Sequence, residues 1–301
     1  MNGLVICNPN AGRHDVIAAL ERALQILRSA GWTLAVRYTT EPGDATRFAQ
    51  EAASDGADVV LVAGGDGTLN EAVQSLAHSD TALGYLPCGT VNIWAREICL
   101  PLEVEGAAHA MLDGRIQRVD LGIAGERYFL LMAGIGFDGE VVRRARSFEQ
   151  HKRRLGILPY VVSTLVTAPL YRGADVELRY DGIIRRVQAL MLVVGNTRLY
   201  GGYFRLTPNA VVNDGWLDLC VIKGKGFLSL ARQSLPILLS RSVSYSDAEL
   251  LRVKDLTVRG DAPLPLQVDG ELIGTTPVQI GIAPKALHAI IPSQFNSDLI
   301  A

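Results

Sequence analysis

The stretch from Val59 to Val73, VVLVAGGDGTLNEAV, constrains the fold of this chain more than any other segment. An apolar run ends on two glycines, an acid and a third glycine follow, and a helical pattern then begins. A buried strand that breaks at glycines and leads into a helix N-terminus typically binds phosphate, because its backbone N–H groups point at the anion. The missing Cβ atoms of Gly64, Gly65 and Gly67 let these amides approach phosphate oxygens. The stretch has neither the lysine-bearing P-loop pattern nor the G-x-G-x-x-G spacing of dinucleotide sites.

The composition indicates a globular protein with room for two domains, because 49% of the 301 residues are apolar and 20% are charged. A formal net charge of -2 argues against a nucleic-acid partner held by overall charge. Four scattered cysteines without a C-x-x-C pair favour free, buried thiols in a reducing compartment. The N-terminus shows no signal peptide, and the weakly polar run 157–171 contains two prolines and is too short to span a bilayer. We therefore expect a cytoplasmic protein that is able to contact the inner membrane surface peripherally.

Strand and helix patterns alternate over the first ~120 residues. Short apolar runs at 4–8, 33–39, 59–63 and 82–86 predict strands, and segments with helical spacing separate them. Asp44 is the expected N-cap of the second helix. This rhythm predicts a doubly wound α/β domain whose ligand crevice lies at the carboxyl ends of the strands. The turns NPNAG, GGDGT and PCGT all follow such strand ends.

The pattern changes after about residue 120, where short alternating strands are separated by Gly and Asn/Asp turns. This predicts an antiparallel, β-sandwich-like second domain, with helices near 155–166 and 227–239. The expected fold class is thus α/β plus β. We expect an N-terminal nucleotide-binding domain over 1–125, to which the tail 292–301 returns, and a β-rich substrate domain over 126–291.

The GGDGTLNE motif carries the first candidate site. Asp66 is placed to bind a phosphate-bridging Mg²⁺, directly or through water. Asn70 and Glu71 fall on the following helix, within reach of the same site. The alternative interpretation is a tight turn in which Asp66 only caps a helix.

Two further glycine turns belong to the same predicted sheet edge. In PCGTVNIWARE, Gly89 and Thr90 offer backbone approach and a hydroxyl, and Asn92 is a candidate contact to a nucleotide. The less favoured alternative is an ordinary βα turn with a threonine cap. The NPNAG turn, 8–12, is weaker alone and gains weight as the third loop at this edge.

The second half contains two acidic turns. GIGFDGEVV places Asp138 in a glycine-flanked turn near the expected domain junction. QVDGE ends a strand with Asp269 and Glu271 on either side of Gly270. Taken singly, such a turn is commonly just a hairpin.

The ordered combination of NPNAGR, GGDGTLNEAV, PCGTVNIWARE, GIGFDGEVV, YGGYFRLTPNAVVNDGWLDL and QVDGE resembles the bacterial diacylglycerol kinase-like lipid kinases. Eukaryotic sphingosine and diacylglycerol kinases belong to the same superfamily. The resemblance covers nearly the whole chain. It implies that ATP binds in a cleft between the two domains and that Mg²⁺ assists transfer of the γ-phosphate to a lipid hydroxyl.

The resemblance also implies roles for individual residues. The nucleotide-contacting positions of the family fall on Asn8, Thr39, Gly64 to Asn70 and Thr90. The catalytic base of the family lies in the DGE motif, which leaves Asp269 and Glu271 as candidates, with Asp269 favoured. The VVNDGW loop matches a metal-holding loop of relatives, with Asp214 and the backbone oxygens of Val211 and Trp216 as ligands.

Two departures from the family pattern bear on the substrate. Ala11 stands where many members carry serine, and Ile93-Trp94 stands where many diacylglycerol kinases carry Asp-Phe. The missing acid concerns substrate class and turnover more than the ATP site, because Gly89, Thr90 and Asn92 remain.

The expected activity is an ATP-dependent lipid kinase of phospholipid metabolism that acts at a membrane surface, and a homodimer is left open. A basic cluster followed by the apolar LGILPYVVSTLV suits an anionic membrane, although a solvated turn before a core helix explains it as well. The members of this cluster are Arg143, Arg144, Arg146, His151, Lys152, Arg153 and Arg154. The alternatives are an NAD kinase, which shares GGDGT but acts on a water-soluble dinucleotide, and a nucleotide-binding protein without catalysis.

Overall fold

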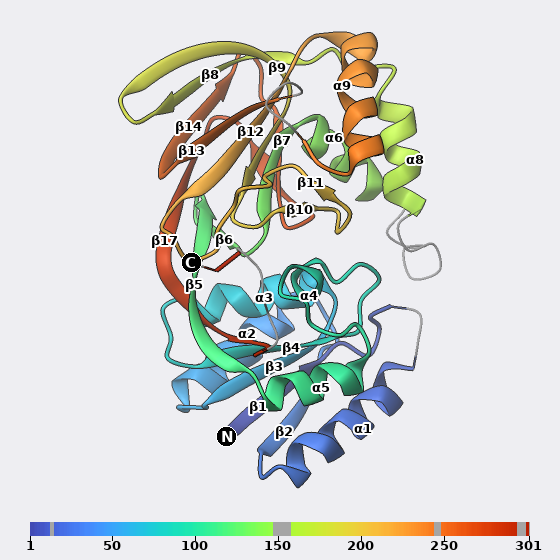
Figure 1. The fold of residues 1–301 in the computed structure, drawn as a ribbon, viewed down its shortest axis with the longest axis vertical. Helices are drawn as coiled ribbons and strands as arrows, with labels where there is room; N and C mark the ends of the chain where they lie inside the picture. Colours follow the sequence, from blue (N-terminus) through green and yellow to red (C-terminus); the bar gives the residue numbers. More distant parts are fainter. Residues whose placement is uncertain (13–14, 147–157, 244–247, 294–298, 301) are drawn as a thin grey trace. The chain divides into compact units, whose positions relative to one another are not determined.

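The computed structural model describes residues 1–12, 15–146, 158–243, 248–293 and 299–300 (Figure 1). The chain divides into two compact units, one formed by Met1–Leu121 with Pro284–Ile300 and the other by Gly122–Ala283. The divisions fall inside strands β5 (Arg115–Ala124) and β17 (Val278–Ile291). The chain returns to the first unit at Pro284, earlier than the expected return near residue 292, and the first division precedes the expected 125/126 boundary.

The first unit is built on a parallel sheet with the order β2-β1-β3-β4, and the C-terminal part of β17 pairs in parallel with β4 through Ala289 and Leu83. Every residue of β3 and β4 is buried, as expected for central strands covered on both faces. The four N-terminal strands are β1 (Asn2–Cys7), β2 (Thr33–Tyr38), β3 (Val59–Gly64) and β4 (Ala82–Pro87). The doubly wound architecture is therefore confirmed.

Helices follow the strands of the first unit, each burying one apolar face. Their bounds are α1 (Val16–Ser29), α2 (Asp44–Ser54), α3 (Asp66–Leu76), α4 (Ile93–Glu97) and α5 (Val104–Leu112). In α1 the Asp15 side chain accepts a hydrogen bond from Ala18 N at 3.1 Å and caps the helix. The expected cap of α2 was wrong, because Gly43 with φ 89° occupies the N-cap and Asp44 begins the helix.

The second unit is an antiparallel, β-sandwich-like assembly, as expected. Its main sheet has the order β16-β15-β7-β9-β8-β14-β17, with β12 and then β13 continuing from β9. A core that includes Phe129, Leu192, Leu219, Leu256 and Ile280 lies among these strands. The strands not yet bounded are β6 (Arg127–Phe129), β7 (Met132–Gly136), β8 (Ala174–Tyr180), β9 (Ile183–Gly195), β10 (Leu199–Tyr200), β11 (Phe204–Arg205), β12 (Leu217–Lys223), β13 (Glu249–Val253), β14 (Asp255–Gly260), β15 (Pro265–Val268) and β16 (Glu271–Thr275).

The described residues of this second unit include the helices α6 (Phe137–Ala145), α8 (Leu158–Thr167) and α9 (Gly226–Ser240). Helix α6 follows β7 directly and packs on β15 and on α8. Within the described segments, no helix has the length and apolarity needed to cross a bilayer.

Candidate functional site

The three glycine turns of the first unit are in contact with one another at the carboxyl ends of β1, β3 and β4. A Cβ added at Gly89 would lie 2.6 Å from the Cα of Gly65, so the GGDGT and PCGT turns meet glycine to glycine. A Cβ at Gly12, which has φ +61°, would lie 2.2 Å from the Cys88 carbonyl oxygen. Any larger residue at Gly12 or Gly89 would force the loops apart. The sequence prediction that these loops share one sheet edge is thus matched by direct packing.

Hydrogen bonds join the NPNAG and GGDGT turns. Asn8 continues the ladder by donating its backbone N–H to the Ala63 carbonyl at 2.9 Å, and its Nδ2 donates to Thr68 Oγ1 at 3.1 Å. Asn8 Oδ1 accepts from Asn10 N at 3.0 Å, which closes the turn on itself. A Cβ at Gly64 would lie 2.8 Å from Thr68 Cβ. Asn8, Gly64 and Thr68 therefore hold the loops in shape.

Gly67 differs from these glycines, because local structure does not require it. A Cβ added there meets no described atom within 4 Å, and the residue does not have a positive φ. It is exposed at the start of α3, and Thr90 is exposed on the facing turn. The open space above Gly67 leaves room for an anion against the N-terminal amides of α3.

Asp66 links the same two turns through its carboxylate. Its Oδ1 accepts a hydrogen bond from the backbone N–H of Ile93 at 2.7 Å, at the first residue of α4. The acid thus caps the neighbouring helix α4, a variant of the capping interpretation that the sequence left open. The side chain of Ile93, which replaces the family acid, is half-buried.

Asn92 and the buried Tyr85 close the PCGT turn from within. Asn92 adopts a left-handed conformation with φ 55°, donates from Nδ2 to Gly89 O at 3.0 Å and accepts at Oδ1 from Gly89 N at 2.9 Å. The Tyr85 hydroxyl lies 2.9 Å from Asn92 Oδ1 and 3.2 Å from Gly64 O. Burial raises the pKa of Tyr85 well above its ordinary value, so the hydroxyl keeps its proton. Sequence reasoning missed Tyr85, whose only signal is a polar group in an otherwise apolar strand.

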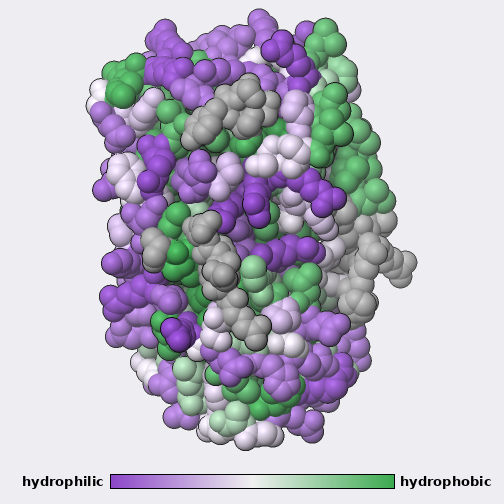
Figure 2. Space-filling view, viewed as in Figure 1, coloured by the Kyte–Doolittle hydropathy of each residue, from purple (hydrophilic) through white to green (hydrophobic). Residues whose placement is uncertain are grey.

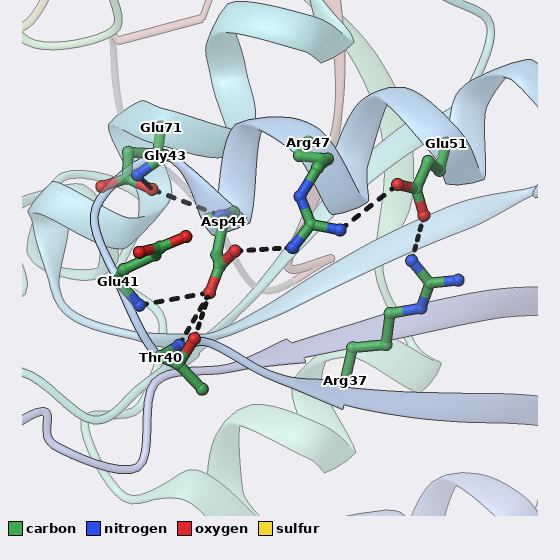
Figure 3. Close-up of polar contacts among 9 residues, drawn as sticks. Arg37, Thr40, Glu41, Gly43, Asp44, Arg47, Glu51 and Glu71 are labelled. Atoms are coloured by element: carbon green, nitrogen blue, oxygen red, sulfur yellow. Dashed lines mark hydrogen bonds and ion pairs between the residues drawn. The ribbon is translucent and has the colours of Figure 1, made fainter.

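The segment 39–43 leads into the start of α2, where Figure 3 shows Thr40, Glu41, Gly43 and Glu71. Thr39 is 9% exposed and donates its N–H to Cys7 O at 2.8 Å. Asp44 accepts from Thr40 N at 2.8 Å and from Glu41 N at 3.2 Å, which folds this segment back onto α2. The Thr40 amide, and next the Arg47 guanidinium, hold the pKa of Asp44 below its usual range.

The Glu71 carboxylate contacts the start of α2. Its Oε2 accepts from Gly43 N at 3.0 Å and from Ala45 N at 3.3 Å, so the carboxylate lies at the N-terminus of α2. Figure 3 shows Glu71 beside Gly43. It also shows the ion pairs of Arg47 with Asp44 and Glu51 along α2. Asn70 is 1% exposed, and Gln74 Nε2 donates to its carbonyl oxygen at 3.0 Å. The Glu71 contacts thus join α3 to the start of α2, whereas the Asn70–Gln74 hydrogen bond lies within α3.

Asp269 occupies a strained and closely held position in the second unit. It has φ 46°, in the left-handed region that non-glycine residues rarely adopt. Its Oδ2 accepts from Leu130 N at 2.9 Å, and its Oδ1 accepts from Leu131 N at 3.0 Å and Met132 N at 2.9 Å. Three backbone donors therefore fix the direction of this carboxylate. Glu271, the other candidate base, forms an ion pair of 2.8 Å with Arg127.

A buried polar network lies beneath the QVDGE turn. The Asp138 carboxylate accepts from Gln267 Nε2 at 2.6 Å and from the Tyr200 hydroxyl, and Gln267 Oε1 accepts from Gly270 N at 2.7 Å. Burial raises the pKa of Asp138. A Cβ at Gly134 would lie 1.6 Å from Asp138 Oδ2, which explains the glycine in GIGFDGEVV. The two acidic motifs found separately in the sequence thus form one network through Gln267, which sequence reasoning had not singled out.

The VVNDGW loop contains Asp214 with its carboxylate already engaged. Its Oδ1 accepts from Trp216 N at 3.0 Å, and its Oδ2 pairs with Arg252, whose guanidinium lies over the Trp216 ring. Val212, within the loop, is fully buried. The described residues contain no group of three or more His, Cys, Asp or Glu side chains able to hold a metal ion. A cation at this loop would have to displace Arg252 from Asp214.

The basic cluster of the sequence is only partly described. Arg143 and Arg144 pair with Glu140, and Arg146 donates to the Leu272 carbonyl at 3.0 Å. His151, Lys152, Arg153 and Arg154 lie outside the described residues.

Residues 2–124 match the family described as the diacylglycerol kinase catalytic domain. Residues 132–291 match the YegS C-terminal NAD kinase beta sandwich-like domain.

Individual relatives agree along the whole chain. The diacylglycerol kinase of Bacillus subtilis is 31% identical over 96% of this chain and 96% of its own length. The diacylglycerol kinase of Staphylococcus aureus (strain bovine RF122 / ET3-1) is 30% identical over 99% of this chain and 95% of its own length. The crystal structure of a diacylglycerol kinase from Bacillus anthracis superposes with a TM-score of 0.80 at 28% identity, covering 96% of both chains. On these matches, the chain belongs to the diacylglycerol kinase family.

Proposed function

We propose that this chain transfers the γ-phosphate of ATP to the hydroxyl of a membrane lipid, with diacylglycerol as the first candidate substrate. The observation that carries the proposal is the contact of three glycine turns around Gly67 and Thr90, which are both exposed. Family membership supports a lipid kinase, since the curated relatives are named diacylglycerol kinase.

In this proposal the first unit binds ATP. The amides at Gly65 and Gly67 hold phosphate oxygens, and the Thr90 hydroxyl adds a further donor. Asn8, Thr39, Asn70, Glu71, Gly89 and Asn92 keep the loops in position through the contacts described above. A Mg²⁺ held by ATP phosphates needs only one or two protein carboxylates, and Asp66 is the acid of the glycine turns. Such an ion, when bound, spreads the charge that develops on the transferred phosphoryl group.

The second unit supplies the lipid site and the base. We assign proton acceptance from the lipid hydroxyl to Asp269, because three amides orient its carboxylate at a strained backbone position. Glu271, which pairs with Arg127, is the second candidate. The Asp138–Gln267 pair fixes the turn that carries both acids.

A separate cation at the VVNDGW loop is a further proposal, with Val211, Asp214 and Trp216 as ligands. The Arg252 guanidinium already neutralises Asp214, so the loop fits a cation only if that pair opens. Peripheral contact with an anionic membrane follows from a lipid substrate. A homodimer is retained as a proposal without a surface assigned to it.

The NAD kinase alternative is not favoured. The second unit matches a domain whose description includes an NAD kinase sandwich, but the same chain matches relatives named diacylglycerol kinase over more than nine-tenths of its length. The two activities differ in their acceptor, a water-soluble dinucleotide or a lipid.

The test is transfer of labelled γ-phosphate from ATP, with Mg²⁺, to diacylglycerol in mixed vesicles and in parallel to NAD. We expect a labelled lipid and no labelled dinucleotide. Label on NAD alone would overturn the lipid assignment. ATP binding without transfer to diacylglycerol, NAD or a total lipid extract would support a nucleotide-binding protein without catalysis.

Matched variants assign the base. Asp269→Asn is expected to lower turnover by about 10²–10⁴ while ATP binding stays nearly unchanged, whereas Glu271→Gln should retain most activity. Because the Asp269 carboxylate also anchors three amides, the thermal stability of each variant must be compared with the parent. Full activity in a folded Asp269→Asn protein would transfer the role to Glu271.

A further inference from the structure

Large exposed hydrophobic side chains gather on two helices of the second unit. The described part of the chain has eighteen such residues. Nine of them lie in α8 or α9, and a tenth, Leu170, follows α8. Figure 2 shows hydrophobic residues gathered over these helices at the upper right. We call this surface the α8–α9 face; its members are Leu158, Val161, Leu165, Val166, Leu170, Phe227, Leu228, Leu235, Leu238 and Leu239. Contiguous apolar surface of this kind marks an interaction site.

Helix α8 turns polar side chains toward the protein and apolar side chains toward solvent. Its side chains of Ser163 and Thr167, which are 0% and 2% exposed, face inward, while Leu165 on the outer side is 68% exposed. Neither Ser163 Oγ nor Thr167 Oγ1 has a hydrogen-bond partner among the described residues. A helix that packs on a protein core normally shows the opposite pattern. The outward apolar stripe of α8 is therefore not explained by folding of this unit.

The charged residues on α8 and α9 and directly flanking them are all basic in the described part of the chain. Neither helix contains an acidic residue. Arg172 follows α8, Lys225 precedes α9, Arg232 lies within it and Arg241 ends it. A face that combines apolar side chains with cations matches the interface of an anionic bilayer. A contact between two copies would instead bring these cations together without acids on the helices to pair with them.

The length of the helices decides how such a face meets a bilayer. The 10 residues of α8 and the 15 residues of α9 extend roughly 15 Å and 22 Å, less than the ~30 Å hydrocarbon core. The helices are thus suited to lie in the interface plane, with leucine side chains reaching the acyl boundary.

We propose that the α8–α9 face docks on the surface of an anionic lipid bilayer and that α9 provides half of the contact. The inference rests on the proposed function, which places the substrate in a membrane. Helix α8 packs on α6, and α6 carries Asp138, which holds Gln267 below the QVDGE turn. Docking through this face brings the lipid surface next to the unit that carries the proposed base.

Vesicle sedimentation tests the proposal, with vesicles of phosphatidylglycerol and phosphatidylcholine against phosphatidylcholine alone. The double variant Leu228→Glu/Leu239→Glu changes side chains that are 82% and 79% exposed, so the fold should be preserved. Ile183→Glu/Ile184→Glu on β9, at 51% and 63% exposure, is the matched control. We expect the α9 variant to bind anionic vesicles about tenfold or more weakly and the control to stay within about twofold of the parent.

A second measurement separates docking from chemistry. Phosphorylation of a short-chain diacylglycerol in detergent micelles should be equal in the parent and the α9 variant, because the substrate no longer has to be drawn from a bilayer. If the parent protein binds anionic vesicles but phosphorylates no lipid, and the α9 variant does not bind the vesicles, the docking proposal stands and the proposed function fails. Unchanged vesicle binding in a folded α9 variant overturns the docking proposal. Conversion of a dimer to a monomer by the same variant, without loss of vesicle binding, also overturns it and identifies a second copy as the partner.

Discussion

Replacement of Gly67 by alanine tests whether the glycine is needed for the local fold or for the approach of a phosphate. A Cβ at this position meets no described atom within 4 Å, and the backbone is that of an ordinary helix start. Alanine in place of glycine in a helix stabilises by up to about 1 kcal/mol, because it restricts the unfolded chain. For a unit of this size we expect the melting temperature to rise by about 1–4 °C.

The effect on ATP should have the opposite sign. If the Gly67 amide donates to a phosphate oxygen, an added methyl group occupies the space through which that oxygen approaches. Loss of one hydrogen bond to a charged group costs about 1.5–3 kcal/mol, which corresponds to an ATP affinity lower by about 10- to 150-fold. Calorimetric titration with ATP and Mg²⁺, together with thermal unfolding, measures both effects on the same preparation.

Gly89→Ala is the matched control for this experiment. Its Cβ would lie 2.6 Å from Gly65 Cα and 2.7 Å from Asn92 Oδ1, so overpacking should lower stability by about 1–3 kcal/mol. A Gly67→Ala protein that is more stable but binds ATP as tightly as the parent would refute the assignment of this turn to phosphate binding. A Gly89→Ala protein of unchanged stability would refute the packing argument.

Three other predictions concern buried groups. Gly134→Ala places a Cβ 1.6 Å from Asp138 Oδ2 and should destabilise the second unit by about 1–3 kcal/mol or more in thermal unfolding; an unchanged transition contradicts this. Because burial raises the pKa of Asp138, the folded state binds its proton more tightly than the unfolded state, so its contribution to stability is greatest below the ordinary carboxyl pKa and falls as pH rises through the raised value. Denaturant unfolding at pH 4 and pH 8 should therefore show a parent-minus-Asp138→Asn stability difference that is larger at pH 4, and a pH-independent difference would disprove it. Cys99 is exposed and should react first with a thiol reagent at pH 8; the others are slower because burial raises their pKa to about 11 for Cys7 and to about 12 for Cys88 and Cys220. Equal labelling rates for all four thiols would count against the burial described here.

Local patterns in the sequence were sufficient to locate most elements. The apolar run before Gly64 and the helical spacing after it correctly predicted β3 and α3, and the same reasoning found the alternating strands of the second unit. The expectation of buried thiols was wrong for Cys99, which is exposed and has a left-handed backbone just after α4, and Cys88 is only half-buried.

The partners of the candidate site residues were less accessible to sequence reasoning. Asp66 and Ile93 lie 27 positions apart, and Asp269 and Leu130 lie 139 apart. The sequence does not show that the Asp66 and Glu71 carboxylates each accept a hydrogen bond at the start of another helix, at Ile93 N and Gly43 N respectively.

The sequence alone determined that glycine turns follow parallel strands at one edge of an α/β domain, because strand periodicity and the conformational freedom of glycine are local properties. Only the tertiary structure decided which of those glycines are required by packing, as Gly89 is, and which remain open to a ligand, as Gly67 is. The outward direction of the apolar face of α8 was likewise decided by the fold, since Ser163 and Thr167 are turned inward. Both outcomes depend on contacts between segments far apart in the chain, and the free energy of such contacts is set by geometry that no local pattern records.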